Sequence, residues 1–517
     1  MIYNTMKKIL ISALATVLAF GLSSCSEEAL DTAPTTAITG DNMFSNATNA
    51  LTPLNGVYRM LYSTWSSDAH HSFGISAHNI VADVMGDDMI MSQQGSGWFW
   101  YECLYDVKDA IGNASWRPYD IWNIYYTIIA NVNYIIDAKE TMGGMPSDIN
   151  YVIGQAYALR AYSYFILAQY YCRNYTDYKG DPGVPLYTEP TYAGTEGKPR
   201  GTVEDVYAQI NADIDSAVVR LTNSHAQTHP SHIDMYVANG IKARICLVQE
   251  RWQDAVDAAR IAQQGASLTR DVLSGMNSVG QADVLWGAEI IADQTGGYAS
   301  FFMHMDKSAG YGASARKQIS KSLYAKIGEN DIRRDWWDTS DTGDGNDVNG
   351  SGYQQMKFRW ANAASWLGDY IWMRVPEMYL IEAEGLCMLN DEAGAKKVLG
   401  TLMSYRDDDY DCSALTGTAL PKVNGRDPET GSLREEIINQ RRIELWGEYG
   451  RIYDIRRLHQ GFVRPEEDGW PIAALLEGLH TDNPDTWDWV MTIPQAEFDA
   501  NKALNQNTDQ NPMDSGI

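Results

Sequence analysis

The sequence predicts a mainly α-helical protein. Apolar residues recur three or four positions apart over long stretches, helix-capping residues stand before several of these stretches, and short turns join some of them in pairs. Segments rich in glycine, aspartate, serine and aromatic residues separate the helical stretches. We therefore expect a helical scaffold that carries an irregular, aromatic-rich face.

The N-terminal residues have the pattern of an export signal. Lys7 and Lys8 precede an apolar run over 9–22, which suits a signal peptide and is short for a membrane span. Small residues then lead into Cys25, an arrangement that resembles the lipidation signal of bacterial lipoproteins. The chain is expected to have three parts: a signal peptide over 1–24, a lipidated N-terminus and tether over 25–45, and a single helical domain over 46–517.

The folded part is expected to begin with long helices. A first helix is expected at 47–61, after the tether, and apolar stripes that must be buried predict helices at 118–138 and 149–171. A further helix begins behind Thr202, because Thr202 and Asp205 form a capping box ahead of another apolar stripe. The cap and the stripe predict the same helix.

Two pairs of antiparallel helices are expected next. Ser231 with Asp234 repeats the capping device, and the helix behind it turns sharply into a second helix over 252–264. The same layout recurs where a helix over 375–389 is joined by a short turn to one over 392–405. Such units are the building blocks of tetratricopeptide-type repeats, which stack on their neighbours to bury their faces.

Three long segments between the helices are expected to carry function or to fold irregularly: 65–116, 268–314 and 335–368. The chain has 16 Trp and 31 Tyr against 10 Phe, so most of its rings carry a polar group. Sugars stack their C–H faces on such rings, while their hydroxyls need polar partners at the ring edges. The candidate ligand contacts, each with core packing as its alternative, are Trp98, Trp100, Tyr101, Tyr298, Phe301 and Trp336.

The balance of charges excludes a general nucleic-acid binder. The formal net charge is −27, whereas phosphate recognition needs a basic surface. An acidic surface is also repelled by anionic lipids, so attachment to a membrane is expected through a lipid on Cys25. The other cysteines are odd in number and have no CxxC spacing, which gives no support to a zinc site.

Carboxylates near the C-terminus raise the question of catalysis. Glu444, Glu448 and Asp454 resemble the paired carboxylates that a glycoside hydrolase needs. However, Glu444 and Glu448 are expected one helical turn apart among several arginines, which form ion pairs with them and lower the pKa of a carboxyl group. We therefore expect no catalytic residues and no enzyme activity.

An acidic loop supplies the candidate metal ligands Asp341, Asp344 and Asp347. Its spacing fails the EF-hand pattern, because Asn349 stands where a bidentate glutamate is required. A solvated loop is the first interpretation, and an irregular structural calcium site is the alternative. No other cofactor is expected.

Several segments resemble the SusD/RagB family, in the order in which the family has them. Residues 158–171 are similar to its repeat helix, and RVPEMYL at 374–380 to its Arg-x-x-Glu-x-Tyr-Leu helix. The block over 441–457, which begins RRIELWGE, resembles the C-terminal signature almost residue by residue, and 493–507 fits the terminal tail. One departure is Tyr449, where a smaller residue is more usual.

The resemblance implies a SusD-like α-helical lipoprotein with tetratricopeptide-like repeats, anchored in the outer membrane and facing the exterior. It also implies a partner, a SusC-like TonB-dependent transporter, to which the protein delivers captured glycan. In the family the ligand face is built from N-terminal and mid-chain loops, which favours the loops of Trp98 and Tyr298. Peptide capture is the alternative ligand class, and a structural lid without ligand affinity and a glycoside hydrolase are further alternatives.

Overall fold

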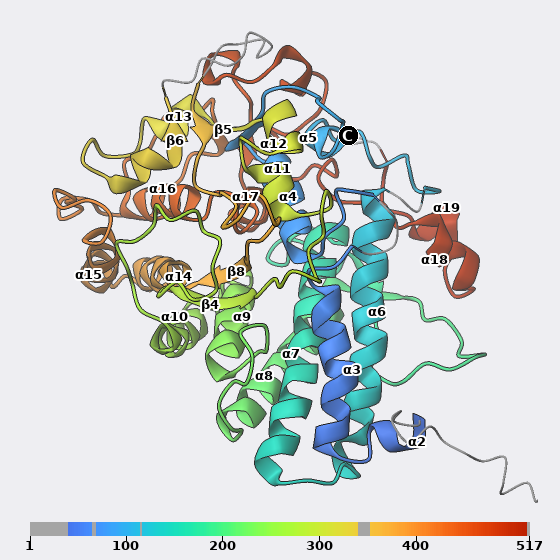
Figure 1. Cartoon of the computed structure of the whole chain (residues 1–517). Coiled ribbons are helices and arrows are strands. Elements are labelled where there is room, and N and C mark those ends of the chain that lie inside the picture. Colours follow the sequence, from blue (N-terminus) through green and yellow to red (C-terminus); the bar gives the residue numbers. More distant parts are fainter. Residues whose placement is uncertain (1–39, 65–68, 114–115, 340–351, 514–517) are drawn as a thin grey trace, which may run out of the picture.

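The computed structural model describes residues 40–64, 69–113, 116–339 and 352–513. Figure 1 shows long helices in one half of the molecule, and short helices, short strands and loops in the other. Buried apolar residues from both halves belong to one hydrophobic cluster. The irregular half is therefore a packed layer on the helical scaffold.

The described helices are, in chain order, α2 (Gly40–Met43), α3 (Ala47–Met60), α4 (Ile75–Val84), α5 (Trp100–Cys103), α6 (Arg117–Asp137), α7 (Pro146–Tyr171), α8 (Val203–Thr222), α9 (Met235–Val248), α10 (Trp252–Ala262), α11 (Phe301–Met305), α12 (Gly310–Ser314), α13 (Lys321–Tyr324), α14 (Val375–Met388), α15 (Glu392–Met403), α16 (Leu433–Glu444), α17 (Arg451–Arg457), α18 (Gln495–Ala500) and α19 (Gln506–Asp509). The described strands are β1 (Met89–Met91), β2 (Pro182–Pro185), β3 (Arg200–Thr202), β4 (Val284–Ala288), β5 (Lys317–Ile319), β6 (Trp337–Asp338), β7 (Gln354–Gln355), β8 (Tyr370–Arg374), β9 (Val423–Asn424) and β10 (Gly461–Phe462).

The strands form small sheets that support the irregular layer. β1, β5, β7 and β6 lie side by side in this order, and each pairs antiparallel with the next. β4 pairs antiparallel with β8, which leads directly into α14. β2 pairs antiparallel with β3, and β9 pairs parallel with β10. These short pairings fix the ends of the long loops.

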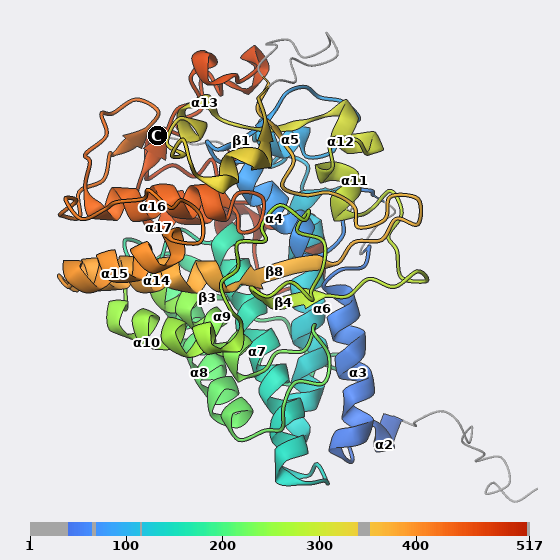
Figure 2. The ribbon, with the colours of Figure 1, turned by 60° about the vertical axis from the view of Figure 1, so that its left-hand side comes forward.

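The scaffold helices stack in the order in which they occur in the chain. α6 packs against α7, α7 against α8, α8 against α9, and α9 against α10. α10 also packs against α14, whose antiparallel partner is α15, so the two predicted helix pairs stack on each other (Figures 1 and 2). The predicted mainly α-helical fold with tetratricopeptide-like helix pairs is confirmed.

Helix boundaries agree with the prediction within a few residues, with one wrong cap. Thr202 caps α8 through a capping box with Asp205, as predicted. Ser231 does not cap α9, because the N-cap is Asp234, whose side chain accepts backbone N–H groups of the first turn. Serine and aspartate both cap well, so their spacing in a sequence leaves the position of the cap open by a few residues.

The segment 65–116 contains a helix, α4, that the sequence pattern did not predict. Every residue of α4 is buried, its polar residues included, and its 10 residues cover fewer than three turns, so its periodic pattern is short. The buried carboxylate of Asp83 accepts the backbone N–H groups of Gly447 and Arg451 at 2.9 and 2.8 Å. α4 thereby ties the first aromatic segment to the C-terminal signature.

Buried ion pairs join that signature to the scaffold. Arg374, at the start of α14, lies 2.8 Å from Asp283, 3.0 Å from Glu444 and 2.6 Å from Glu448. Glu444 also pairs with Arg406 at 2.9 Å. The prediction that arginines satisfy these carboxylates is confirmed. However, α16 ends at Glu444, so Glu448 lies in the following turn and not one turn further along the same helix.

Among the described residues, no helix is long and apolar enough to cross a membrane. The predicted signal peptide and Cys25 lie outside the described residues. α2 falls within the range expected for the tether. The division into signal peptide, tether and domain stays a prediction.

Candidate functional site

The Trp98 loop is held in place by glycines that allow close backbone contact. Gly95 and Gly97 have positive φ values of 52° and 85°, a conformation that favours glycine. A Cβ atom on Gly95 would lie 2.8 Å from the carbonyl oxygen of Ser314. The amide of Gln93 donates to the same oxygen at 2.7 Å. The loop is therefore fixed against the end of α12.

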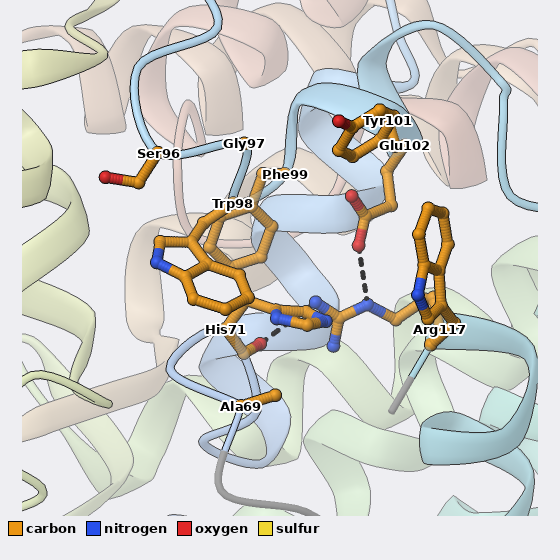
Figure 3. A pocket seen from close by; sticks show the side chains of 10 residues that line it. Ala69, His71, Ser96, Gly97, Trp98, Phe99, Tyr101, Glu102 and Arg117 are labelled. Atoms are coloured by element: carbon orange, nitrogen blue, oxygen red, sulfur yellow. Dashed lines mark hydrogen bonds and ion pairs between the residues drawn. The ribbon is translucent and has the colours of Figure 1, made fainter. Parts of the chain in front are cut away.

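A cavity of about 560 Å³ lies beneath this loop, between α5 and the N-terminus of α6 (Figure 3). The ring of Trp98 stacks on His71, with centroids 4.9 Å apart and an interplanar angle of 25°. On the other side, Tyr101 packs against Trp116 at 5.3 Å. The lining residues include these rings and two charged side chains, Glu102 and Arg117. We call this cavity the Trp98 pocket.

The charges at the Trp98 pocket are already paired. Arg117 donates from Nε to Glu102 at 3.0 Å, from one terminal nitrogen to Asp120 at 2.8 Å, and from the other to the carbonyl of His71 at 2.9 Å. Burial, followed by the charge of Arg117, lowers the pKa of His71 to about 4, so the ring is neutral at physiological pH. The pocket offers hydrogen-bonding groups but no unpaired cation among its described lining residues.

An aromatic platform continues from the Trp98 pocket; its members are His70, Trp98, Tyr298, Tyr311 and Trp366. The ring of His70 lies 5.7 Å from Trp98, 5.6 Å from Tyr298 and 5.7 Å from Tyr311. Trp366 packs on Tyr298 at 5.4 Å. Tyr298 is 52% exposed and Trp366 is 36% exposed. Segments far apart in the chain thus present one partly exposed set of rings.

Two family profiles match the chain. Residues 41–247 match the profile described as "Starch-binding associating with outer membrane", and residues 309–510 match the profile of the SusD family. The chain belongs to the SusD/RagB family. The predicted family resemblance is confirmed, and the matched ranges include both the helical scaffold and the C-terminal signature.

Solved structures of the family have the same fold. A SusD-like carbohydrate binding protein from Bacteroides vulgatus has a TM-score of 0.75 and 26% identity, over 90% of this chain and 98% of that one. A SusD superfamily protein from Bacteroides thetaiotaomicron has a TM-score of 0.73 and 20% identity, over 90% and 100%. A laminarin binding SusD-like protein has a TM-score of 0.62 and 17% identity, over 91% and 100%.

One curated relative, the SusD-like protein P38 of Formosa agariphila, is 32% identical over 123 residues. This match covers 23% of the present chain and 22% of the relative. The chain thus matches about a fifth of the length of that relative.

In this SusD family member, some of the predicted ligand contacts lie at the site and others are buried in the core. Trp98 and Tyr101 line the pocket, and Tyr298 lies on the platform, so these three remain candidate ligand contacts. Trp100 is 8% exposed and does not line the pocket, and Phe301 is 7% exposed and packs against other phenylalanines. Both rings therefore belong to the hydrophobic core, which was the alternative for each candidate.

Trp336 is a correction to the predicted contacts. Its side chain is fully buried, and its indole N–H donates to the carbonyl of Val272 at 2.7 Å. The ring packs against Trp337, which is buried as well. A tryptophan pair beside an acidic loop resembled an exposed site in the sequence, but both rings belong to the core.

Sequence reasoning missed His70, Trp116, Tyr311 and Trp366. All four lie in the long aromatic segments, and this position is the only sequence signal that could have identified them. No local pattern distinguishes them from core aromatic residues, because their neighbours in the site come from distant parts of the chain. Their role depends on the tertiary structure.

The candidate calcium ligands Asp341, Asp344 and Asp347 lie outside the described residues. The neighbouring Asp338 is described, and it pairs with Lys307 at 2.6 Å. Within the described ranges, no group of three or more histidine, cysteine, aspartate or glutamate side chains is arranged to hold a metal ion. A calcium site in this loop stays a prediction.

Proposed function

We propose that this protein is a non-catalytic receptor that captures neutral glycans at the cell surface and delivers them to a SusC-like TonB-dependent transporter. The observation that carries the proposal is the convergence of the aromatic platform with the Trp98 pocket. Partly exposed tryptophan and tyrosine rings next to hydrogen-bonding groups suit a sugar, which has apolar faces and polar edges.

The polar groups of the pocket favour a neutral ligand. Arg117 is satisfied by Glu102, Asp120 and a backbone carbonyl. A uronate or sulfate group would compete with these carboxylates for the guanidinium and would lie close to them. The net charge of −27 adds a general repulsion of polyanions. Hydroxyl groups, in contrast, donate to carboxylates without a charge penalty.

The known properties named for related proteins agree with glycan capture. The matching N-terminal profile is described as starch-binding and associated with the outer membrane, and one structural neighbour is described as laminarin binding. A second neighbour, from Bacteroides vulgatus, is described as a carbohydrate binding protein. These descriptions apply to the relatives, and they support the same ligand class here.

The arrangement of the molecule suits an N-terminal anchor. In Figures 1 and 2, α2 lies at one end of the long helices, whereas α5, α11 and α12, beside the aromatic platform, lie at the other end. A lipid on Cys25, joined to α2 by a short tether, would leave the platform facing away from the attachment point. This arrangement supports an anchored protein that presents its ligand face to the exterior.

A hydrolase is disfavoured by the surroundings of the carboxylates. Burial alone would raise the pKa of Glu444, but Arg406 and Arg374 hold it well below its usual value. Burial would likewise raise the pKa of Glu448, and Arg374 and Lys357 lower it. A general acid needs a raised pKa and access to substrate, and both side chains are buried.

The first test is calorimetric titration of the soluble chain that begins after Cys25. The panel pairs neutral polysaccharides (laminarin, starch, galactomannan) with anionic ones (alginate, polygalacturonate) and with a mixture of peptides. We expect saturable binding of a neutral glycan, with no release of reducing ends. Trp98→Ala should weaken this binding about tenfold, because stacking on one aromatic ring contributes about 1.4 kcal/mol.

The other outcomes separate the alternatives. Binding of anionic polysaccharide would keep glycan capture and refute the preference for neutral ligands. Peptide binding without glycan binding would favour the peptide alternative. Release of reducing ends would identify a hydrolase. Co-purification with a barrel partner in the absence of any measurable ligand would favour a structural lid.

A further inference from the structure

A second cavity lies on another part of α6, away from the Trp98 pocket. It has a volume of about 310 Å³, near the lower limit for small-ligand sites. Its walls come from α6, from the segment 186–199 that joins β2 to β3, and from α18. Tyr126, Tyr187 and Tyr192 supply rings, and Glu497 and Asn501 supply polar groups. We call it the tyrosine cavity.

The floor of the tyrosine cavity is created by a gap in a row of aromatic residues. Trp122, Tyr126, Ala130 and Tyr134 are spaced four apart on α6 and therefore lie along one side of the helix. Ala130 is the small member of this row and lines the cavity. An aromatic side chain at this position would fill the space.

The segment 186–199 forms a wall that is rigidly held. Tyr164 of α7 donates to the carbonyl of Tyr187 at 2.9 Å and accepts its N–H at 2.6 Å. Asn133 of α6 donates to the same carbonyl at 3.0 Å, and Arg160 of α7 donates to the carbonyl of Thr188 at 3.0 Å. Tyr134 bonds to the carbonyl of Thr191. The rings of this segment are thus positioned before any ligand arrives.

The polar side of the tyrosine cavity is rich in acceptors. Glu497 accepts from Asn501 with one carboxylate oxygen, at 2.8 Å, and from the indole N–H of Trp122 with the other, at 3.1 Å. A carboxylate oxygen has a second lone pair, so each can accept a further hydrogen bond. Glu196 is exposed at the rim. The described lining residues therefore carry carboxylates and no cation, although Lys198 lies 5.7 Å from the ring of Tyr187.

We infer that the tyrosine cavity is a second saccharide site, which holds one neutral sugar unit of a long glycan. Rigid aromatic rings and acceptors for hydroxyl groups match the chemistry of a sugar, and the carboxylates disfavour an acidic one. Residues 117 and 126–130 of α6 are separated by about 13 to 20 Å along the helix axis, at 1.5 Å per residue. This inference rests on the proposed glycan binding, and it adds a second point of attachment.

Two attachment points predict a dependence on chain length. A polysaccharide that reaches both sites binds more tightly than a short fragment, because the second contact is intramolecular. A disaccharide of the same glycan depends on each site separately. Loss of the tyrosine cavity should therefore weaken polysaccharide binding more than disaccharide binding at the aromatic platform.

The test uses affinity electrophoresis in gels that contain the neutral polysaccharide best retained by the wild-type protein. Tyr192→Ala removes an exposed ring, and Ala130→Phe fills the cavity without removing a hydrogen bond. Each change should lower the apparent affinity about three- to tenfold, the loss of one aromatic contact. Ile472→Ala, at another exposed apolar residue outside both cavities, is the matched control and should change nothing.

The Trp98→Ala protein separates the two sites. It should retain weak binding that disappears when Tyr192→Ala is added. If the polysaccharide retards both Tyr192→Ala and Ala130→Phe as strongly as the wild-type protein, the proposal of a second site is refuted, and the proposed binding at the platform is unaffected. If no neutral polysaccharide retards the wild-type protein, the proposed function fails, and the second site fails with it. If Ala130→Phe does not fold, as judged by circular dichroism, the result for Tyr192→Ala alone tests the second site. This variant is expected to fold, because Tyr192 is 68% exposed.

Discussion

At the scale of single residues, exposure separates aromatic side chains that can contact a ligand from those that hold the fold. Tyr298 has half of its surface open to solvent, whereas Trp336 has none. Both residues follow glycine- or aspartate-rich sequence, and both are polar aromatics. Their roles differ because only the ring of Tyr298 meets the platform.

Substitution of these two residues should have opposite effects. Tyr298→Ala is expected to lower glycan affinity about five- to tenfold with little change in thermal stability, because the ring is exposed and stacks on its neighbours. Trp336→Ala is expected to cost about 3 to 5 kcal/mol of stability, because it leaves a buried cavity. Calorimetry and chemical denaturation measure the two effects. Equal loss of stability in both variants would contradict the assignment.

His71 should make stability, but not ligand binding, depend on pH. Its pKa is lowered to about 4 in the folded protein, by burial first and then by Arg117, whereas an unfolded histidine has a pKa of about 6.5. The unfolded state therefore binds more protons between these values, and the free energy of unfolding falls as the pH drops through this window. For this group alone, the full loss is about 3.4 kcal/mol.

Denaturation curves at several pH values check this expectation. His71→Gln should flatten the dependence of unfolding free energy on pH between about 6.5 and 4. The contribution of His71 to glycan affinity should stay constant between about pH 5 and 8, because its ring is neutral throughout that range. A loss of glycan affinity near pH 6.5 that His71→Gln abolishes, and that His70→Gln leaves in place, would contradict this expectation.

At the scale of elements, the sequence predicted the long helices, both those with a solvent-exposed face, such as α8, and those buried almost all round, such as α7. The stripes of α3, α6 and α8 repeat every three or four residues, and their caps or boundaries follow. The sequence pattern missed α4 because its 10 residues cover fewer than three turns, which is too short for a clear periodic pattern. The sequence predicted only part of the aromatic platform, because its rings come into contact only after distant segments of the chain fold together.

The ion pairs of Arg374 should be essential for this arrangement of elements. Arg374→Met leaves Asp283, Glu444 and Glu448 without one of their buried partners and should destabilise the fold by about 3 to 5 kcal/mol. The matched control is Arg426→Met, which breaks an exposed pair with Asp482 and should cost less than about 1 kcal/mol. Urea denaturation measures both, and similar losses would contradict the structural role of the buried network.

At the scale of the whole molecule, α2 and the elements beside the aromatic platform lie at opposite ends of the long helices (Figure 1). The sequence predicted the lipidated Cys25 from local residues alone, because a short motif suffices for such a signal. The direction in which the platform faces required the arrangement of the long helices. Local motifs and tertiary structure thus supply different parts of the proposed function.

Cys25→Ala should detach the protein from the membrane without affecting its ligand. We expect the variant to appear in the soluble fraction of exported proteins and to bind glycan with wild-type affinity, because the platform is distant from α2, the first described helix. Membrane fractionation with immunoblotting, followed by titration, measures the two properties. A variant that remains in the outer membrane would show that another contact holds the protein there.

The contacts between α4 and the C-terminal signature also bear on how the protein is made. Asp88 and Arg442 are 354 residues apart in the chain, yet a guanidinium nitrogen of Arg442 lies 2.6 Å from a carboxylate oxygen of Asp88. A polypeptide is synthesised from its N-terminus, so the acidic residues near α4 remain without their arginines until most of the chain has been made. A prematurely terminated chain therefore cannot complete this core and remains open to proteases. Folding of the N-terminal part of this core therefore depends on synthesis of the C-terminal signature.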